Sequence, residues 1–141
     1  MMVSIKETEL YSEVLKEFNY SFGDVFIFKN CVVSEVKEDV DFGWDEHAQK
    51  IVKDVFSATG SRGDDLVFIS NRINSYSVQA MDWLKFFKQS YNLKAYCVVS
   101  QNRSGILNTM IEKLFFPKKI KHFNSIYEAL NFVEKRLAEV S

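Results

Sequence analysis

The chain has 141 residues, of which 47% are apolar and 26% are charged, as is ordinary for a globular protein that is large enough to bury its own core. Its formal net charge of −1 argues against nucleic acid as a partner, because phosphate backbones are bound by basic surfaces. The first residues are polar and acidic rather than a signal peptide, and no apolar run approaches the ~20 residues that span a bilayer, so no transmembrane segment is predicted.

The two cysteines, Cys31 and Cys97, do not form a CxxC pair. Each lies in an apolar run typical of a β-strand, where a free cysteine behaves as a small buried hydrophobic residue. We therefore expect reduced thiols and a cytoplasmic location. No linker, repeat or low-complexity segment interrupts the chain, which predicts a single domain over residues 1–141.

The first third of the chain is predicted to form strands. Residues 10–18 alternate loosely between apolar and polar side chains, and turn-forming residues follow at 19–24. Apolar runs at 25–28 and 31–36 are separated by a tight polar break at 29–30. Three runs joined by short polar segments are typical of an antiparallel meander.

The apolar spacing becomes helical from Trp44 to Phe56, and Gly60 follows where a helix C-cap is expected. Strands and helices then alternate. Continuous apolar strands are predicted at 66–69 and 95–99, with a helix around 78–91 between them. The next helix, which ends near Pro117, is marked by five apolar residues: Ile106, Leu107, Met110, Ile111 and Leu114.

The chain closes with a short strand at about 120–123 and a helix that opens on the capping-box sequence Ser125–Glu128. Apolar strands separated by helices predict βαβ crossovers and a parallel part of the sheet. The expected fold class is therefore α/β, with antiparallel N-terminal strands followed by βαβαβα and helices packed on a mixed sheet.

Sequence motifs for catalysis and metal binding are missing. Gly60–Gly63 precedes a strand, whereas a phosphate-binding loop follows a strand and opens a helix. His47 and His122 have no second ligand at metal-site spacing, and no GxSxG or Cys–His signature is present. We therefore predict a protein that is not an enzyme and that uses no cofactor or metal.

Polar side chains follow both apolar strands, at the edge where ligands bind to open parallel sheets. The candidate partner- or ligand-binding residues are Asn71, Arg72, Asn74, Ser75, Tyr76, Ser77, Gln101, Asn102, Arg103 and Ser104. Two guanidinium groups beside two helix N-termini are expected to attract anions. Helix capping alone explains the same serines and asparagines, and a shallow enzyme site around Arg72 and Arg103 is a weaker alternative.

From about Phe22 to Leu137, the order of elements and the turn Ser75-Tyr76-Ser77-Val78 resemble SpoIIAA-like proteins of the STAS superfamily. The resemblance implies a regulatory domain that binds a partner protein, with a serine at a helix N-terminus that a partner kinase phosphorylates. Ser75 or Ser77 would be that serine, although the Asp-Ser-x-Gly-type sequence of the family is absent and Tyr76 replaces a small residue.

Two functions remain as alternatives. The first is a non-enzymatic regulatory module that binds another protein through the 71–77 edge. The second is a binder of a small apolar ligand or lipid, suggested by 13 Phe, 6 Tyr and 2 Trp, although a ring-rich core explains them as well. A homodimer through the N-terminal edge strands is a further hypothesis.

Overall fold

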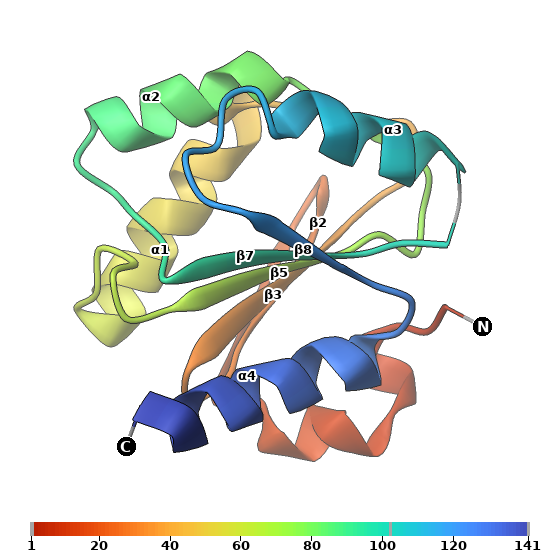
Figure 1. Cartoon of the computed structure of the whole chain (residues 1–141), viewed down its shortest axis with the longest axis vertical. Helices are drawn as coiled ribbons and strands as arrows, with labels where there is room; N and C mark the ends of the chain where they lie inside the picture. The colour runs from red at the N-terminus through yellow and green to blue at the C-terminus, as the bar shows by residue number, and fades with distance from the viewer. Residues whose placement is uncertain (1, 102, 141) are drawn as a thin grey trace.

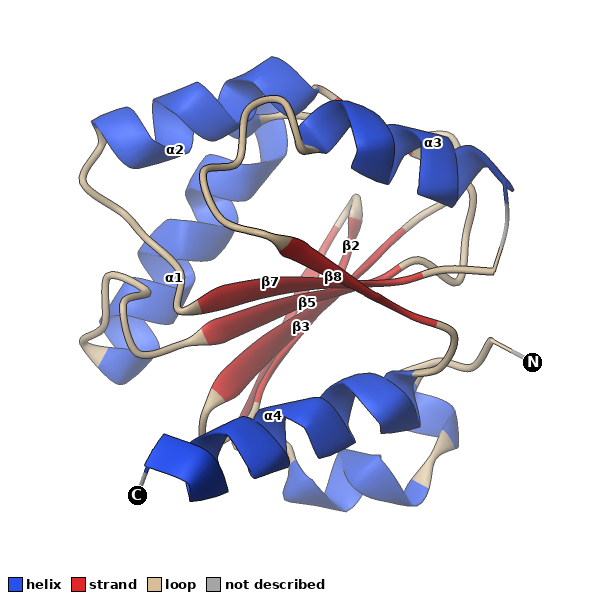
Figure 2. Ribbon diagram, in the orientation of Figure 1, coloured by secondary structure: helices blue, strands red, loops and turns tan. Residues whose placement is uncertain are grey.

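A single six-stranded sheet organises the fold, and helices cover both of its faces (Figures 1 and 2). The computed structural model describes residues 2–101 and 103–140, without the side chains of residues 103–105 and 136–140. The strands, in their spatial order, are β1 (Lys16–Tyr20), β2 (Gly23–Ile27), β3 (Cys31–Val36), β5 (Val67–Asn71), β7 (Ala95–Val99) and β8 (Ile120–Phe123).

The mixed sheet predicted from the sequence is confirmed. Strands β1, β2 and β3 are antiparallel neighbours, and β3, β5, β7 and β8 run parallel. The two central parallel strands, β5 and β7, are the continuous apolar runs of the sequence, because side chains are buried on both of their faces. A separate two-stranded sheet pairs β4 (Asp41–Phe42) with β6 (Ser77–Val78).

Helices α1 (Gln49–Thr59), α2 (Trp83–Lys88) and α3 (Arg103–Glu112) lie over one face of the sheet (Figure 1). Helix α4 (Ile126–Val140) and two short N-terminal 3₁₀ helices, Ile5–Glu7 and Glu9–Glu13, cover the other face. None of the helices in the described part of the chain is long and apolar enough to cross a membrane.

Two expected helix termini are confirmed. Gly60 ends α1 with a φ of 74°, and its backbone N–H donates to the Phe56 carbonyl at 2.7 Å. Before α4, the Ser125 hydroxyl accepts from Glu128 N at 3.2 Å, and the Glu128 carboxylate accepts from Asn124 N at 3.2 Å. Local sequence signals therefore defined these ends correctly.

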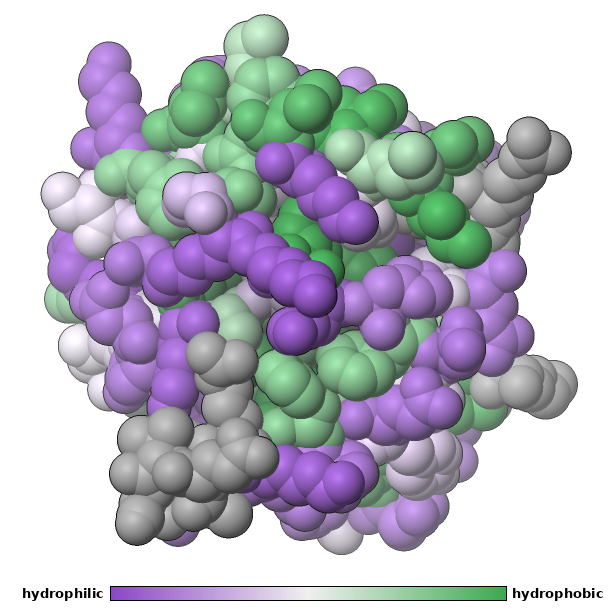
Figure 3. Space-filling view, viewed as in Figure 1, coloured by the Kyte–Doolittle hydropathy of each residue, from purple (hydrophilic) through white to green (hydrophobic). Residues whose placement is uncertain are grey.

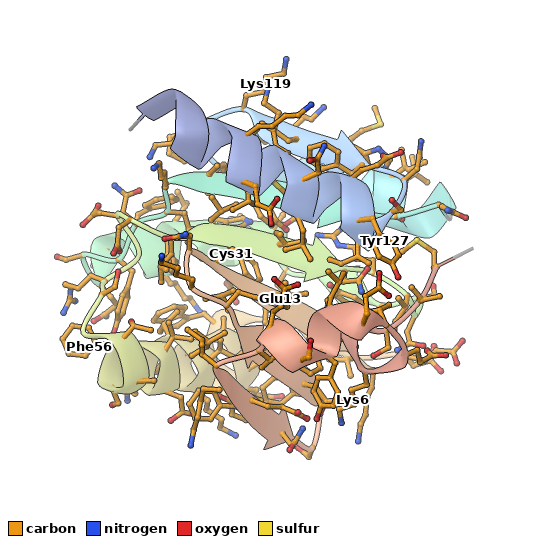
Figure 4. The ribbon with its side chains drawn as sticks, turned by 90° about the horizontal axis from the view of Figure 1, so that it is seen from below. Lys6, Glu13, Cys31, Phe56, Lys119 and Tyr127 are labelled. Carbon is orange, nitrogen blue, oxygen red and sulfur yellow. The ribbon has the colours of Figure 1, made fainter. Side chains whose placement is uncertain are left out.

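The strand expected at 10–18 is wrong in its first half, where residues 9–13 form a 3₁₀ helix. The Thr8 hydroxyl accepts from Leu10 N at 3.2 Å and so favours the helical turn over an extended strand. The turn stays close to α4, where Tyr127 donates to Glu9 Oε2 at 3.1 Å (Figure 4).

The helix expected around 78–91 is shorter than predicted. Val78 lies in β6, a 3₁₀ turn occupies Ala80–Asp82, and α2 covers only 83–88. The reason is tertiary: β6 pairs with β4, and Asp82 Oδ2 accepts from Trp44 N at 2.8 Å.

The core has two layers, one on each face of the sheet. Under α4 it contains Phe26, Ile69 and both cysteines, which are buried and form no disulfide, as predicted. Burial raises the pKa of the Cys31 thiol to about 12, so the thiol stays protonated at neutral pH. The layer under α1, α2 and α3 is rich in aromatic rings, with Trp44, Phe86 and Tyr96 at its centre.

Candidate functional site

The residues at the end of β5, Asn71 and Arg72, turn into the protein instead of lining an open edge. Asn71 and Arg72 are only 1% and 2% exposed. The Asn71 amide donates to the Val3 carbonyl at 3.1 Å and to Glu35 Oε2 at 2.9 Å, so it ties the N-terminal segment to the sheet. The prediction that Arg72 contributes an accessible guanidinium at this edge is therefore wrong.

Arg72 is the centre of a buried polar network. Its Nη2 lies 2.5 Å from Glu112 Oε2 and 2.9 Å from the Tyr96 hydroxyl, and its Nε donates to Ser70 Oγ at 3.1 Å. The side chains of Arg72 and Glu112 are 2% and 1% exposed, so this ion pair is shielded from water. The positive charge expected to attract anions is thus neutralised inside the protein.

The Glu112 carboxylate is also fully engaged. Its Oε1 accepts from Tyr96 OH at 2.7 Å and from Trp83 Nε1 at 3.0 Å. Burial by itself lowers the pKa of Arg72. The neighbouring Tyr96, Tyr76 and Glu112 outweigh this effect, so the pKa of Arg72 lies above its ordinary value. Because each charged group has a partner of opposite charge and further hydrogen bonds, the network is a structural clamp between β5, β7 and α3.

Raising the pH above about 10 is expected to lower the free energy of unfolding. Burial raises the pKa of Tyr76 and Tyr96 above the ordinary 10.0. The unfolded chain loses these protons near pH 10 while the folded chain keeps them, so the stabilisation is complete below that pH and is lost as the pH rises through the folded values. Urea unfolding at about pH 8 and about pH 11 measures the effect, and equal midpoints would contradict it.

The other candidate residues lie in two segments, residues 74–77 after β5 and residues 101–104 after β7. Ser75 and Ser77 are exposed, Asn74 is half-buried and donates to the Val36 carbonyl at 3.0 Å, and Tyr76 is buried against Ser70. Ser77 lies in β6, and its hydroxyl donates to Asp41 Oδ1 at 2.8 Å. Ser75 and Ser77 therefore do not cap a helix, contrary to expectation, because the small β4–β6 sheet separates them from α2.

The second cluster of candidates is only partly described. Gln101 is exposed, and its amide donates to the Asn124 carbonyl at 2.8 Å. Asn102 and the side chains of Arg103 and Ser104 lie outside the described residues. Within the part of the chain that the structure describes, no group of three or more His, Cys, Asp or Glu residues could hold a metal ion.

Helix α3 presents its apolar side to solvent, which sequence reasoning missed. Ile106, Leu107, Met110 and Ile111 lie on one side of the helix and are 41–59% exposed, and Leu114, just beyond its end, is 77% exposed. Thr109 and Glu112 lie on the opposite side and are buried. A surface helix normally has the reverse arrangement, with apolar residues facing the core.

Polar contacts hold α3 in this orientation. Asn108 Nδ2 donates to the Tyr76 carbonyl at 2.9 Å, Thr109 Oγ1 accepts from Arg72 at 3.3 Å, and Glu112 forms the ion pair. These bonds require the polar side of α3 to face the sheet, so the apolar side must point outward. In the sequence, Asn108, Thr109 and Glu112 alternate with the apolar residues, and this spacing indicates a helix with one polar and one apolar side.

The exposed apolar surface continues from α3 to α2. Met81 and Leu84 are 63% and 53% exposed, and hydrophobic side chains extend across the top of the molecule over both helices (Figure 3). We call the exposed side chains of Met81, Leu84, Ile106, Leu107, Met110, Ile111 and Leu114 the α2–α3 face. Contiguous apolar surface of this kind marks interaction sites in proteins.

The α2–α3 face lies in the basic part of the chain. Residues 79–119 contain seven Lys and Arg and two acidic residues, a formal charge of +5 in a chain whose total is −1. Both acidic residues are already paired, Asp82 with Lys85 at 3.6 Å and Glu112 with Arg72. The exposed cations include Lys88, Lys113 and Lys119, and Figure 4 shows Lys119 projecting from the edge of the molecule.

An apolar cavity of about 120 Å³ lies beneath the same helices, between them and the sheet. Its walls come from α1, α2, β5 and the loop at 61–63, and Arg72, Tyr76 and Glu112 border one part of it. The volume is below the range of about 300–1,000 Å³ for pockets that hold drug-sized ligands.

The geometry defines an α/β protein with a covered mixed sheet, a buried Arg–Glu clamp and an exposed apolar helix face. No protein-family model matches the chain, and neither a curated protein nor a solved structure is significantly similar to it. What the protein does must therefore be inferred from its own side chains.

Proposed function

We propose that this chain is a non-enzymatic regulatory module that binds an acidic amphipathic helix of a partner protein on its α2–α3 face. The observation that carries the proposal is the outward apolar side of α3. Four apolar side chains of this helix, and Leu114 just beyond its end, remain in water although the same helix buries a glutamate and a threonine. An apolar partner surface would remove them from water, which stabilises a complex by about 1.5–3 kcal/mol for each fully buried Leu, Ile or Met.

The charge around the face supports the choice of partner. The exposed lysines 88, 113, 118 and 119 accompany the apolar side chains, and the acidic residues between 79 and 119 are both paired within the protein. Exposed lysines near an apolar surface attract a negative segment and speed its association. A helix with leucines on one side and glutamates on the other matches both the apolar face and these lysines.

We also propose that the 71–77 edge regulates this binding, as the resemblance to SpoIIAA-like proteins implies. Ser75 and Ser77 are exposed and flank Tyr76, whose carbonyl accepts from Asn108 of α3. A phosphate on either serine would place negative charge beside α3 and repel an acidic partner. SpoIIAA-like membership is likewise proposed. A cytoplasmic location is proposed because Cys31 and Cys97 form no disulfide.

The test uses a fluorescent peptide of about 18 residues, five helical turns, with Leu on one side and Glu on the other. We expect saturable binding to the full chain, weaker binding when ionic strength rises from about 0.15 M to about 1 M, and no binding of the same peptide with Lys in place of Glu. The double variant Leu107→Lys/Leu114→Lys should lose about 100-fold in affinity, since each buried Leu contributes more than about 1.4 kcal/mol.

Leu15→Lys is the matched control. Leu15 is 70% exposed and lies next to β1, outside the α2–α3 face, so the substitution should leave peptide affinity unchanged. All three leucines are exposed, and we expect their substitution to change the free energy of unfolding by less than about 0.5 kcal/mol.

Two other results would contradict the proposal. Binding to vesicles of phosphatidylglycerol without binding to the acidic peptide would make the face a membrane-surface site. A concentration-dependent dimer in analytical ultracentrifugation, abolished by Leu107→Lys/Leu114→Lys, would show that a second copy of the chain covers the face.

A further inference from the structure

The cavity beneath α1 and α2 is separate from the α2–α3 face and has its own chemistry. Its volume is about 120 Å³, and its walls are mainly carbon. Side chains from the sheet and from the helices over it form these walls, among them Trp44, Ile51, Val55, Phe68, Trp83 and Phe86. A ligand at this position would contact both the sheet and the helix layer.

The polar side chains at the Arg72 end of the cavity already have partners. Ser70 Oγ lies 2.7 Å from the Tyr76 hydroxyl and accepts from Arg72 Nε, while Glu112 accepts from Tyr96 and Trp83. A buried water needs two to four polar partners, and a polar ligand needs a free donor or acceptor. Because these groups are engaged and the walls are mainly carbon, apolar contact is the main means of recognition, which favours an apolar molecule over water.

The size and shape of the cavity narrow the ligand further. A dry apolar cavity of roughly 150 Å³ in another protein binds benzene, and the present volume is close to that. The walls carry several ring systems: Phe68 and Tyr96 stack with centroids 5.5 Å apart, and Trp83 lies 5.0 Å from Tyr96. Ring faces and edges pack well against another planar ring.

We propose that this cavity is a binding site for a small, uncharged aromatic molecule the size of a single ring. This inference does not depend on the docking of a partner helix, because the cavity and the α2–α3 face use different side chains. The sequence suggested a small apolar ligand or a lipid, and the volume of the cavity favours a molecule much smaller than a lipid.

Benzene is the probe, added to the full chain and followed by two-dimensional NMR. We expect saturable shifts of the Trp44 and Trp83 indole signals, nuclear Overhauser contacts from benzene to Phe68, and a midpoint of thermal unfolding that rises with benzene concentration. Phenol should bind more weakly than benzene, because its hydroxyl would leave water for a cavity whose walls are mainly carbon.

Val55→Phe fills the cavity and should lower benzene affinity at least tenfold. The matched control on the same helix is Ala58→Phe, which adds the same ring at an exposed position and should bind benzene like the unmodified chain. The Leu107→Lys/Leu114→Lys variant should also bind benzene normally, which keeps this test apart from that of the docking function.

Several results would overturn the assignment. They are the absence of saturable shifts in the unmodified chain, equal affinity in Val55→Phe, phenol binding as tightly as benzene, or binding of palmitate in place of benzene. The contacts from benzene to Phe68 are measured on the unmodified chain, so the test stands even if Val55→Phe does not fold.

Discussion

Replacing Arg72 with methionine is expected to lower the free energy of unfolding by about 3–5 kcal/mol, because it leaves the Glu112 carboxylate buried without its counter-charge. That carboxylate is 1% exposed and accepts its shortest contact, 2.5 Å, from Arg72. The loss is a large fraction of the roughly 5–15 kcal/mol that stabilises a typical domain. The midpoint and slope of urea unfolding measure it.

The double variant Arg72→Met/Glu112→Leu is the control for the charge. Removing both members of a buried pair is often nearly neutral when apolar residues of similar volume replace them. We therefore expect the double variant to be more stable than Arg72→Met alone, with a coupling free energy well above about 0.5 kcal/mol in the double-mutant cycle. Additive single effects would show that the pair is not coupled.

Arg72→Met should loosen α3 in particular. That helix contacts the body of the protein through Asn108, Thr109 and Glu112, and Arg72 bonds two of these three residues. Amide hydrogen exchange should accelerate at 103–116 more than in β5 or β7, since few apolar contacts replace the lost bonds. Because α3 supports the proposed docking surface, the variant should also bind the acidic peptide more weakly.

Replacing Gly63 with alanine is expected to destabilise the fold by about 3 kcal/mol or more. Gly63 has a φ of 106°, in a region that L-residues rarely adopt, and a Cβ there would overlap the carbonyl oxygen of Asn92. That carbonyl cannot easily move, because the neighbouring Asn92 N donates to the Arg62 carbonyl at 3.0 Å and Lys94 N donates to Leu66 at 2.8 Å. Thermal and urea unfolding measure the loss.

Gly60→Ala separates the two causes. Gly60 has a φ of 74° but no atom lies within 4 Å of the position a Cβ would take, so only the backbone strain of about 1 kcal/mol is expected. A loss in Gly63→Ala no larger than that in Gly60→Ala would show that the 61–63 loop can move away from Asn92.

Local patterns in the sequence predicted most of the architecture. The apolar runs at 66–69 and 95–99 became the central parallel strands β5 and β7, and Gly60 and Ser125 marked helix ends where expected. Such features depend on neighbours within a few residues along the chain, so periodicity and capping residues are sufficient to find them.

Predictions that depended on distant neighbours were less successful. The helix expected around 78–91 begins only at Trp83, because Ser77 and Val78 pair with a strand 36 residues earlier and a 3₁₀ turn follows at Ala80–Asp82. Arg72 was expected at an accessible edge, but Glu112, 40 residues later, draws it inward. A single sequence gives no indication of which residue meets which across such separations.

The sequence by itself therefore determined the α/β class, the mixed sheet, the buried cysteines and the apolar side of α3. Only the tertiary structure decided that this side faces outward, because the Arg72–Glu112 pair turns the polar side of the helix towards the sheet. It also decided that side chains from α1, α2 and β5 leave a cavity between them. Periodicity shows which residues share a face, whereas long-range pairing decides which way that face points.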